Sequence, residues 1–243
     1  MDFPLKIQII LTKVKTLEQI GFIGTYDKKD LLLNIANILV LNGQKVLIVD
    51  ATLMQRLKYI APRIGNTNTY VSEYRGIDIA LGFMNLGSIA QYLGTPNSLP
   101  YDFVFVDSDN LQTINSFMIP RMQKIYLVTS YEKYELERTM ELLKILNLSI
   151  NITKVVYSPD INDKQEQYFN QLLSKTPVKL LKNKVLIADT SEDRKVTLEN
   201  QLLSEIRYKH YSSQYKSSLE YITALITENI LPQTEIRKTI KKD

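Results

Sequence analysis

The chain has 243 residues, of which 44% are hydrophobic and 23% are charged, as in an ordinary soluble globular protein. It has no cysteine, which excludes disulfides, cysteine nucleophiles and thiolate metal sites, and its single histidine excludes a histidine-based metal centre. The net charge of +4 is too small to indicate nucleic acid binding, and no apolar run reaches the roughly 20 residues of a membrane span. We therefore expect one cytoplasmic domain over residues 1–243.

The N-terminal half predicts a strand, helix, strand unit around a short turn. Its expected elements are, in chain order, strand 5–11, strand 20–23, helix 28–42, strand 46–49, short helix 54–60, strand 77–81, helix 86–93 and strand 101–107. The helix at 28–42 is apolar almost all round, which is typical of a buried crossover helix. With the β-branched strand that follows it, this helix predicts a parallel βαβ unit.

The C-terminal half continues the alternation. It is expected to contain strand 124–129, helix 132–146, strand 152–157, helix 163–174, strand 185–188 and helices 192–206 and 213–229. Residues 51–75 are polar and read as irregular, and the basic segment 232–243 reads as a flexible tail. Alternating strands and helices predict an α/β fold with a mostly parallel, doubly wound sheet flanked by helices, a Rossmann-like three-layer sandwich.

Three stretches carry a family resemblance. The order of LLLNIANILVLNGQKVLIVDAT, YDFVFVD and KIYLVTS resembles the ParA/MinD family of deviant Walker-A ATPases, which have a P-loop NTPase fold. Those proteins place a phosphate loop, KGGVGKTT, before LxxNLAxxLAxxGxKVLxIDxD and follow it with YDxxxxD. The resemblance covers roughly residues 21–146 and is most specific from Asn34 to Asp50.

The resemblance assigns family positions to several residues. Gly24 falls on the second loop glycine, Thr25 on the position after it and Lys28 on the invariant P-loop lysine. Asp50 matches the aspartate that ends the second strand, and Asp107 matches the Walker-B aspartate. A functional family member would bind ATP and magnesium at these positions.

The same alignment shows departures. They are Ile23 for the signature lysine, Asp27 for the glycine before the P-loop lysine, Lys29 and Asp30 for the hydroxyl residues, Thr52 for a second aspartate, and Tyr157 near the position of an adenine-reading asparagine. The Asp27 carboxylate would disfavour a phosphate about 4 Å away by about 4 kcal/mol at an effective dielectric near 20. Lys29 offers no hydroxyl to magnesium.

Asp27 also has a simpler interpretation as the N-cap of the helix, in which its carboxylate takes the N–H groups that a phosphate would use. The candidate binding residues are therefore Gly24, Thr25, Asp27, Lys28, Lys29, Asp50 and Asp107, with no catalytic residue and no metal ligand expected. No cofactor is expected either, and ATP is the alternative.

Asp50 and Asp107 end adjacent strands in the predicted sheet, so they should lie together at its ligand-binding edge. They resemble magnesium-positioning and water-positioning carboxylates, although strand-end aspartates also cap the next loop. Without a metal, Asp107 is expected to attract Lys28 or Lys29 as an internal ion pair.

Late tyrosines and the single histidine have structural interpretations. Tyr208, Tyr211, Tyr215 and Tyr221 recur at near-helical spacing, which favours a packing stripe over a stacking platform for nucleic acid. No nucleophile-elbow motif accompanies His210, so we expect it at the surface or in packing.

Three hypotheses follow. The first is a pseudo-ATPase with this fold that organises or assembles a cytoplasmic or membrane-associated machine through a protein partner. The second is an ATP-hydrolysing switch that dimerises on binding ATP through Lys28. The third is a DNA-associated factor whose basic surface includes Arg237, Lys238, Lys241 and Lys242. The resemblance implies a homodimer or a heterodimer with a related ATPase, and a place at the membrane or nucleoid.

Overall fold

The structure is a computed structural model, and it describes residues 17–158, 163–188, 190–228 and 230–242. The strand predicted at 5–11 lies outside the described residues. Among the helices described, none is long and apolar enough to cross a membrane.

One eight-stranded sheet forms the centre of the molecule, with strand order β3-β4-β2-β5-β1-β6-β7-β8. Neighbouring strands are parallel except for β3 and β4, which are antiparallel at one edge. The strands are β1 (Glu18–Ile23), β2 (Val46–Asp50), β3 (Tyr70–Tyr74), β4 (Ile77–Leu81), β5 (Phe103–Ser108), β6 (Lys124–Ser130), β7 (Asn151–Ser158) and β8 (Lys179–Ala188). The predicted doubly wound, mostly parallel sheet is confirmed.

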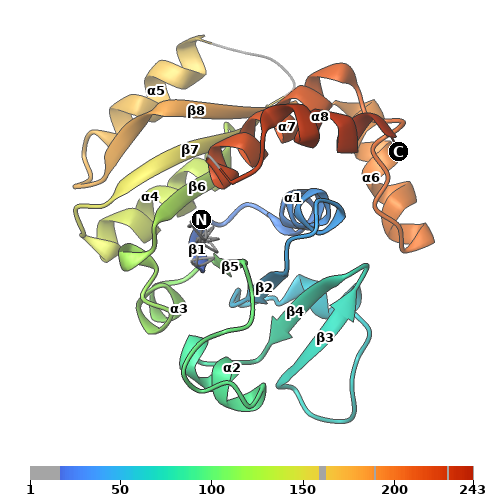
Figure 1. Cartoon of the computed structure of the whole chain (residues 1–243). Coiled ribbons are helices and arrows are strands. Elements are labelled where there is room, and N and C mark those ends of the chain that lie inside the picture. Colours follow the sequence, from blue (N-terminus) through green and yellow to red (C-terminus); the bar gives the residue numbers. More distant parts are fainter. Residues whose placement is uncertain (1–16, 159–162, 189, 229, 243) are drawn as a thin grey trace, which may run out of the picture.

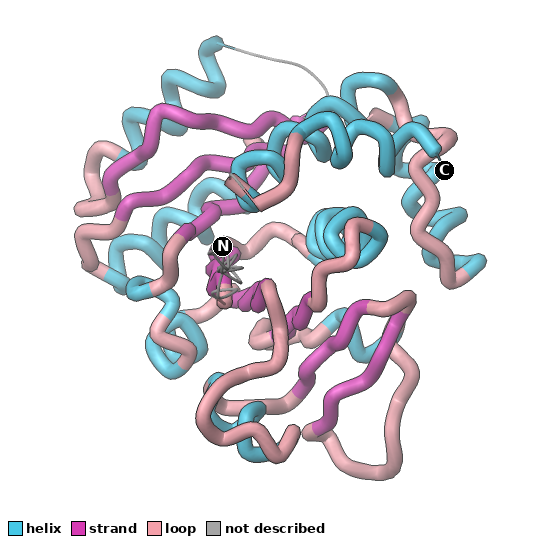
Figure 2. Tube along the Cα trace, viewed as in Figure 1, coloured by secondary structure: helices cyan, strands magenta, loops and turns pink. Residues whose placement is uncertain are grey.

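Helices cover both faces of the sheet (Figures 1 and 2). They are α1 (Lys29–Leu41), α2 (Leu86–Tyr92), α3 (Leu111–Ser116), α4 (Lys133–Leu146), α5 (Asp163–Leu173), α6 (Ser191–Leu203), α7 (Ser213–Thr227) and α8 (Gln233–Lys242), with short 3-10 turns η1 (Arg56–Tyr59) and η2 (Ile119–Arg121). One apolar core joins the sheet to α1, α7 and α8, and a second joins its other face to α2, α3, α4 and α5. The three layers match the predicted sandwich.

The crossover helix α1 lies in the interior of the molecule. All nine consecutive residues from Leu31 to Leu39 are buried. Its two buried amides are paired with tyrosines from the C-terminal region. Asn37 Nδ2 donates to the Tyr208 hydroxyl at 2.9 Å, and Asn34 Nδ2 donates to the Tyr215 hydroxyl at 3.3 Å. Tyr211 stacks on Tyr215 with ring centroids 4.3 Å apart.

The predicted packing role therefore holds for Tyr208, Tyr211 and Tyr215, whereas Tyr221 is 40% exposed. Tyr208 and Tyr211 precede α7 and do not lie within a helix, so the helical spacing was only partly right. His210 is exposed, as expected.

Two segments differ from the sequence prediction. Residues 51–75 contain β3, which the polar composition concealed, and the short helix expected at 54–60 is the 3-10 turn η1. The basic segment 232–243 was predicted as a flexible tail, but residues 233–242 form α8. Ile236 and Ile240 are buried against the core that contains α1 and α7, and this burial holds α8 in place.

Candidate functional site

The candidate site is the loop from Gly24 to Lys28, which leaves the carboxyl end of β1 and enters α1. β1 lies between β5 and β6, so the loop sits at the ligand-binding edge of the parallel sheet. Gly24 has φ +122°, and a Cβ atom there would lie 2.2 Å from the carbonyl oxygen of Val128. Only glycine permits this close approach of the two backbones.

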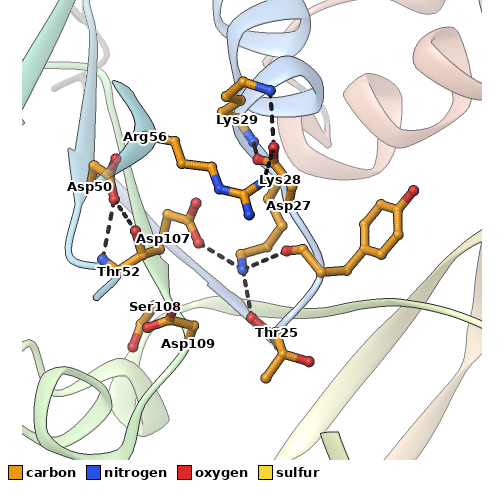
Figure 3. Close-up of polar contacts among 12 residues, drawn as sticks. Thr25, Asp27, Lys28, Lys29, Asp50, Thr52, Arg56, Asp107, Ser108 and Asp109 are labelled. Carbon is orange, nitrogen blue, oxygen red and sulfur yellow. Dashed lines mark hydrogen bonds and ion pairs between the residues drawn. The ribbon is translucent and has the colours of Figure 1, made fainter. Parts of the chain in front are cut away.

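Lys28 folds back into its own loop (Figure 3). Its side chain is 1% exposed, and Nζ lies 2.9 Å from Oδ1 of Asp107, forming the predicted internal ion pair. The same ammonium donates to the carbonyl oxygens of Gly24 at 2.6 Å and Tyr26 at 3.1 Å. The ammonium group therefore makes two hydrogen bonds and one ion pair within this corner of the molecule.

The Asp27 side chain places a negative charge in the loop. Oδ1 accepts the backbone N–H of Lys29 at 3.1 Å, while Oδ2 contacts Lys29 Nζ at 2.9 Å and Arg56 Nη1 at 2.6 Å (Figure 3). Burial alone would raise the pKa of Asp27, but the charges and hydrogen bonds of Lys29 and Arg56 hold it below the usual value. The carboxylate is therefore a fixed negative charge at the start of α1.

The expected N-cap role of Asp27 needs a small correction. The N-cap position is Lys28, which makes no side-chain capping bond. Asp27 stands one residue earlier and still accepts the N–H of Lys29, the first residue of α1. A carboxylate therefore holds an N–H group that a bound anion would otherwise use.

Asp50 is fully engaged by the segment that follows β2. Oδ1 accepts the Thr52 hydroxyl at 2.6 Å and the Thr52 N–H at 3.2 Å, and Oδ2 accepts the Leu57 N–H at 3.0 Å. Burial raises the pKa of Asp50 above its usual value, opposed by these hydrogen bonds. This carboxylate thus caps the loop that leads into η1, the structural alternative considered for strand-end aspartates.

Asp107 lies directly beside Asp50 in the register of β5 and β2, as predicted. It is 4% exposed. Burial raises the pKa of Asp107 to about 7, the Lys28 ammonium opposes that rise, and the neighbouring Asp50 adds to it. Asp107 thus serves as the internal counter-charge of Lys28.

Two pockets border the loop. A small one of about 80 Å³ lies between the loop and the ends of β2 and β5, and is lined by Lys28, Asp50 and Asp107 among others. It is well below the few hundred Å³ of a usual ligand site. A larger pocket of about 380 Å³ lies on the other side of Asp27, against α4 and α6.

The structure brings all seven predicted site residues together around this loop. Thr25 is tied down as well, because its hydroxyl donates to Oε2 of Glu135 at 2.7 Å. Tyr157 packs its ring against Tyr26, with centroids 4.6 Å apart, at the wall of the larger pocket. Sequence reasoning missed Arg56 and Glu135, which lie in the η1 segment and in α4, and no local motif marks either residue.

The loop does not suit a magnesium ion and a triphosphate in its present arrangement. Lys29 carries no hydroxyl, and the Asp50 oxygens already accept three hydrogen bonds. The Lys28 ammonium is turned away into an ion pair with Asp107 and two hydrogen bonds to loop carbonyl oxygens. Among the described residues, no group of three or more histidine, cysteine or acidic side chains could hold a metal ion.

Solved structures were compared with the whole chain, and several align over most of their own length. MinD from Pyrococcus horikoshii complexed with Mg-ADP is 18% identical with TM-score 0.54, covering 86% of this chain and 97% of that one. MinD in the MinC:MinD complex of Aquifex aeolicus is 13% identical with TM-score 0.58, covering 88% and 98%.

The chain has the ParA/MinD fold. A third structure of this type is a putative plasmid partition protein from Borrelia burgdorferi bound to AMPPNP, with TM-score 0.55 and 14% identity over 88% of this chain and 100% of that one. No protein-family model matches the sequence, and no curated protein matches it. The ParA/MinD resemblance noted in the sequence is thereby confirmed for the fold.

Proposed function

We propose that this protein is a pseudo-ATPase of the ParA/MinD fold. It binds a protein partner and acts as a spatial-organising or assembly adaptor for a cytoplasmic or membrane-associated machine, without hydrolysing ATP. The observation that carries the proposal is the Asp27 carboxylate, held by the Lys29 N–H, the Lys29 ammonium and the Arg56 guanidinium.

Electrostatics support this proposal. Taken alone, the Asp27 carboxylate disfavours a phosphate group about 4 Å away by about 4 kcal/mol at an effective dielectric near 20, and its ion pairs with Lys29 and Arg56 reduce this repulsion. Each 1.4 kcal/mol corresponds to about tenfold in affinity. Lys28 offsets little of this, since it would have to leave Asp107 and two carbonyl oxygens before it could reach a phosphate.

A role in positioning or assembly is supported by the proteins that share the fold. One of the MinD structures is in complex with MinC, and another solved structure is described as a putative plasmid partition protein. For the present chain this favours a protein partner, with a homodimer or a heterodimer with a related ATPase as the expected assembly.

The test is a titration with a fluorescent ATP analogue, with and without magnesium. We expect no saturable binding by the wild-type protein at micromolar concentrations, and a gain in affinity for the double variant Asp27→Gly, Lys29→Thr. His210→Ala, far from the loop in sequence and exposed, is the matched control. Micromolar binding by the wild type that Lys28→Ala abolishes would overturn the proposal.

A second candidate is an ATP-dependent dimerising switch. It is favoured by the retained Lys28 at the family's lysine position and by the open pocket of about 380 Å³ beside the loop. Phosphate release from ATP that depends on both magnesium and Lys28 would select this candidate over the first.

The DNA hypothesis has weaker support from the C-terminal cations. Arg237 pairs with Glu220 at 2.8 Å and Lys238 pairs with Glu235 at 2.7 Å, so their charges are partly neutralised. A gel shift on nonspecific duplex that weakens steeply with salt and is lost with Lys241→Ala, Lys242→Ala would support this hypothesis.

A further inference from the structure

The first half of β8 is an exposed edge of the sheet. β8 is the last strand in the sheet order, with β7 as its neighbour (Figure 1). Its first six residues, Lys179 to Lys184, are all exposed. Further along, α7 covers the strand, and the Ser218 hydroxyl donates to the Leu186 carbonyl oxygen at 2.6 Å. The open part of this edge is therefore the stretch before Val185.

Positive charge is concentrated at this edge. The sequence from 167 to 188 contains no acidic residue and has four lysines, which are Lys175, Lys179, Lys182 and Lys184. Lys184 lies 3.5 Å from Glu166 of α5. In the part of the chain that the structure describes, no acidic side chain lies within salt-bridge distance of the other three lysines, and all three are exposed. These three lysines therefore present positive charge that no neighbour neutralises.

Two exposed leucines lie between the lysines. Leu180 is 39% exposed and Leu181 is 48% exposed. Leu180 pairs with Ile152, whose side chain belongs to the core on the α4 and α5 face of the sheet. Because successive side chains of a strand point to opposite faces, Leu181 points to the other face. The edge thus exposes apolar surface on both faces of the sheet.

The chain that enters β7 adds to this apolar surface. The Lys179 N–H donates to the Ile150 carbonyl oxygen at 2.8 Å, which joins the start of β8 to the segment before β7. In that segment Leu148 is 40% exposed, and Ile145 at the end of α4 is 64% exposed. A basic surface with several exposed aliphatic side chains is unlike an ordinary solvated strand edge.

The leucines distinguish between the anionic partners that could meet these lysines. Nucleic acid offers phosphates to lysine, but its backbone gives leucine no apolar contact. Addition of an acidic protein strand is disfavoured by the register shift between Ile152 and Lys154, which interrupts the regular pairing of this edge. An anionic bilayer can accept an edge that is apolar on both faces, because acyl chains surround the leucines while the headgroups meet the lysines.

We propose that residues 175–184 bind an anionic lipid surface. Leu180 and Leu181 insert among the headgroups, and Lys175, Lys179 and Lys182 contact their negative groups. The formal net charge of the whole chain is only +4, so the attraction comes from the local concentration of lysines. This inference goes beyond the proposed function, because it does not depend on what the Gly24 loop binds.

The test is co-sedimentation of the full chain, at low salt, with vesicles made of equal parts phosphatidylserine and phosphatidylcholine. We expect the protein to pellet with these vesicles and to stay in solution with phosphatidylcholine alone. One lysine near an anionic surface strengthens binding about fivefold, so Lys175→Gln, Lys179→Gln, Lys182→Gln should weaken it about a hundredfold. Leu180→Ser, Leu181→Ser should weaken it about tenfold.

The matched control removes three lysines from α8, in the variant Lys238→Gln, Lys241→Gln, Lys242→Gln. It makes the same change in net charge, and its side chains are exposed, like those replaced on β8. This variant should bind the vesicles as the wild type does. Equal losses in the two triple variants would show attraction by overall charge, and would overturn the site.

Two other results would also overturn the lipid site. If the wild type does not pellet with the anionic vesicles, the lysines only keep this edge from pairing with strands of other molecules. Binding that needs the lysines but not the leucines would indicate a soluble acidic partner or nucleic acid. The ATP titration concerns the loop alone, so failure of the lipid site leaves the pseudo-ATPase proposal standing.

Discussion

At the scale of residues, the buried pair of Lys28 and Asp107 is the feature most sensitive to change. Removing one member of a buried ion pair leaves an uncompensated charge and typically costs about 3–5 kcal/mol. We expect Lys28→Met to lower the free energy of unfolding by this order, and Lys28→Met combined with Asp107→Asn to recover part of it. Urea unfolding followed by circular dichroism measures both.

A double variant as unstable as Lys28→Met alone would show that the two side chains do not depend on each other. The expected coupling follows from their 2.9 Å contact and from exposures of 1% and 6% for the two side chains.

The same pair predicts a pH dependence. Burial raises the pKa of Asp107 to about 7 in the folded state, whereas an unfolded aspartate titrates near 4. The folded state therefore binds the proton more tightly, and the associated stability is present below about pH 4 and lost as the pH rises to about 7.

Lys28, Asp50 and Asp109 all act on this carboxyl group, so the comparison must be made against a variant that keeps them. The difference in unfolding free energy between wild type and Asp107→Asn, measured from pH 4 to 8, should change through this window and level off above it. A difference that is flat with pH would contradict the raised pKa.

At the scale of elements, α8 is held by packing, although its sequence is strongly basic. Ile236 is 0% exposed and Ile240 is 3% exposed. Truncating a buried isoleucine to alanine costs about 2–5 kcal/mol. We expect Ile236→Ala to reduce stability by this amount in urea unfolding.

Lys242→Ala is the matched control on the same helix, because this side chain is exposed. Its effect should stay within about 0.5 kcal/mol. Equal effects of the two substitutions would mean that α8 is not packed as described.

A second element-scale feature is the clamp between α5 and β7. Glu166 of α5 bonds to Lys154 of β7 and to the Tyr131 hydroxyl. Burial opposes ionisation, but these partners lower the pKa of Glu166 to about 2. Stability from this clamp is present above about pH 4.5 and lost as the pH falls toward 2, opposite in direction to that from Asp107.

Glu166→Gln should therefore lower the stability above about pH 4.5, and should remove the part of the acid destabilisation that occurs between about pH 4.5 and 2. Thermal unfolding at several acidic pH values measures it, with the exposed Glu137→Gln as the control. If the unfolding temperature of Glu166→Gln fell with acid in the same way as that of the wild type does, Glu166 would not stabilise the contact between α5 and β7.

The elements also show what sequence could and could not foresee. The βαβ unit was predictable because α1 is apolar all round and β2 is a short aliphatic run. β3 was missed because one of its three buried positions is Ser72, whose hydroxyl bonds to the Pro62 carbonyl. In the sequence a serine at this position favours a loop, because nothing local shows that its hydroxyl bonds to the Pro62 carbonyl.

In the site, the identity of the loop residues followed from the sequence, but the contacts that fix them did not. An ion pair of Asp107 with Lys28 or Lys29 was predicted from the position of Asp107 at the end of a strand, and the structure shows the pair with Lys28. Arg56 reaches Asp27 only because η1 turns the chain back over the loop, and that path depends on the hydrogen bonds that Asp50 makes to Thr52 and Leu57.

At the scale of the whole molecule, the proposal of a pseudo-ATPase predicts an oligomeric state that does not change when ATP is added. We expect the mass measured by light scattering to be the same multiple of 28.1 kDa with and without magnesium and ATP. The Asp27→Gly, Lys29→Thr variant serves as the comparison. A wild-type mass that doubles when ATP is added would favour the switch.

The main-chain contact between Gly24 and Val128 has a practical consequence for protein engineering. The backbone of the turn after β1 is fixed by its close approach to the neighbouring strand β6. Asp27 and Lys29 take no part in this backbone contact, so we expect both to be exchangeable while Gly24 and Lys28 are kept, which makes the molecule a suitable host for grafting a working phosphate loop.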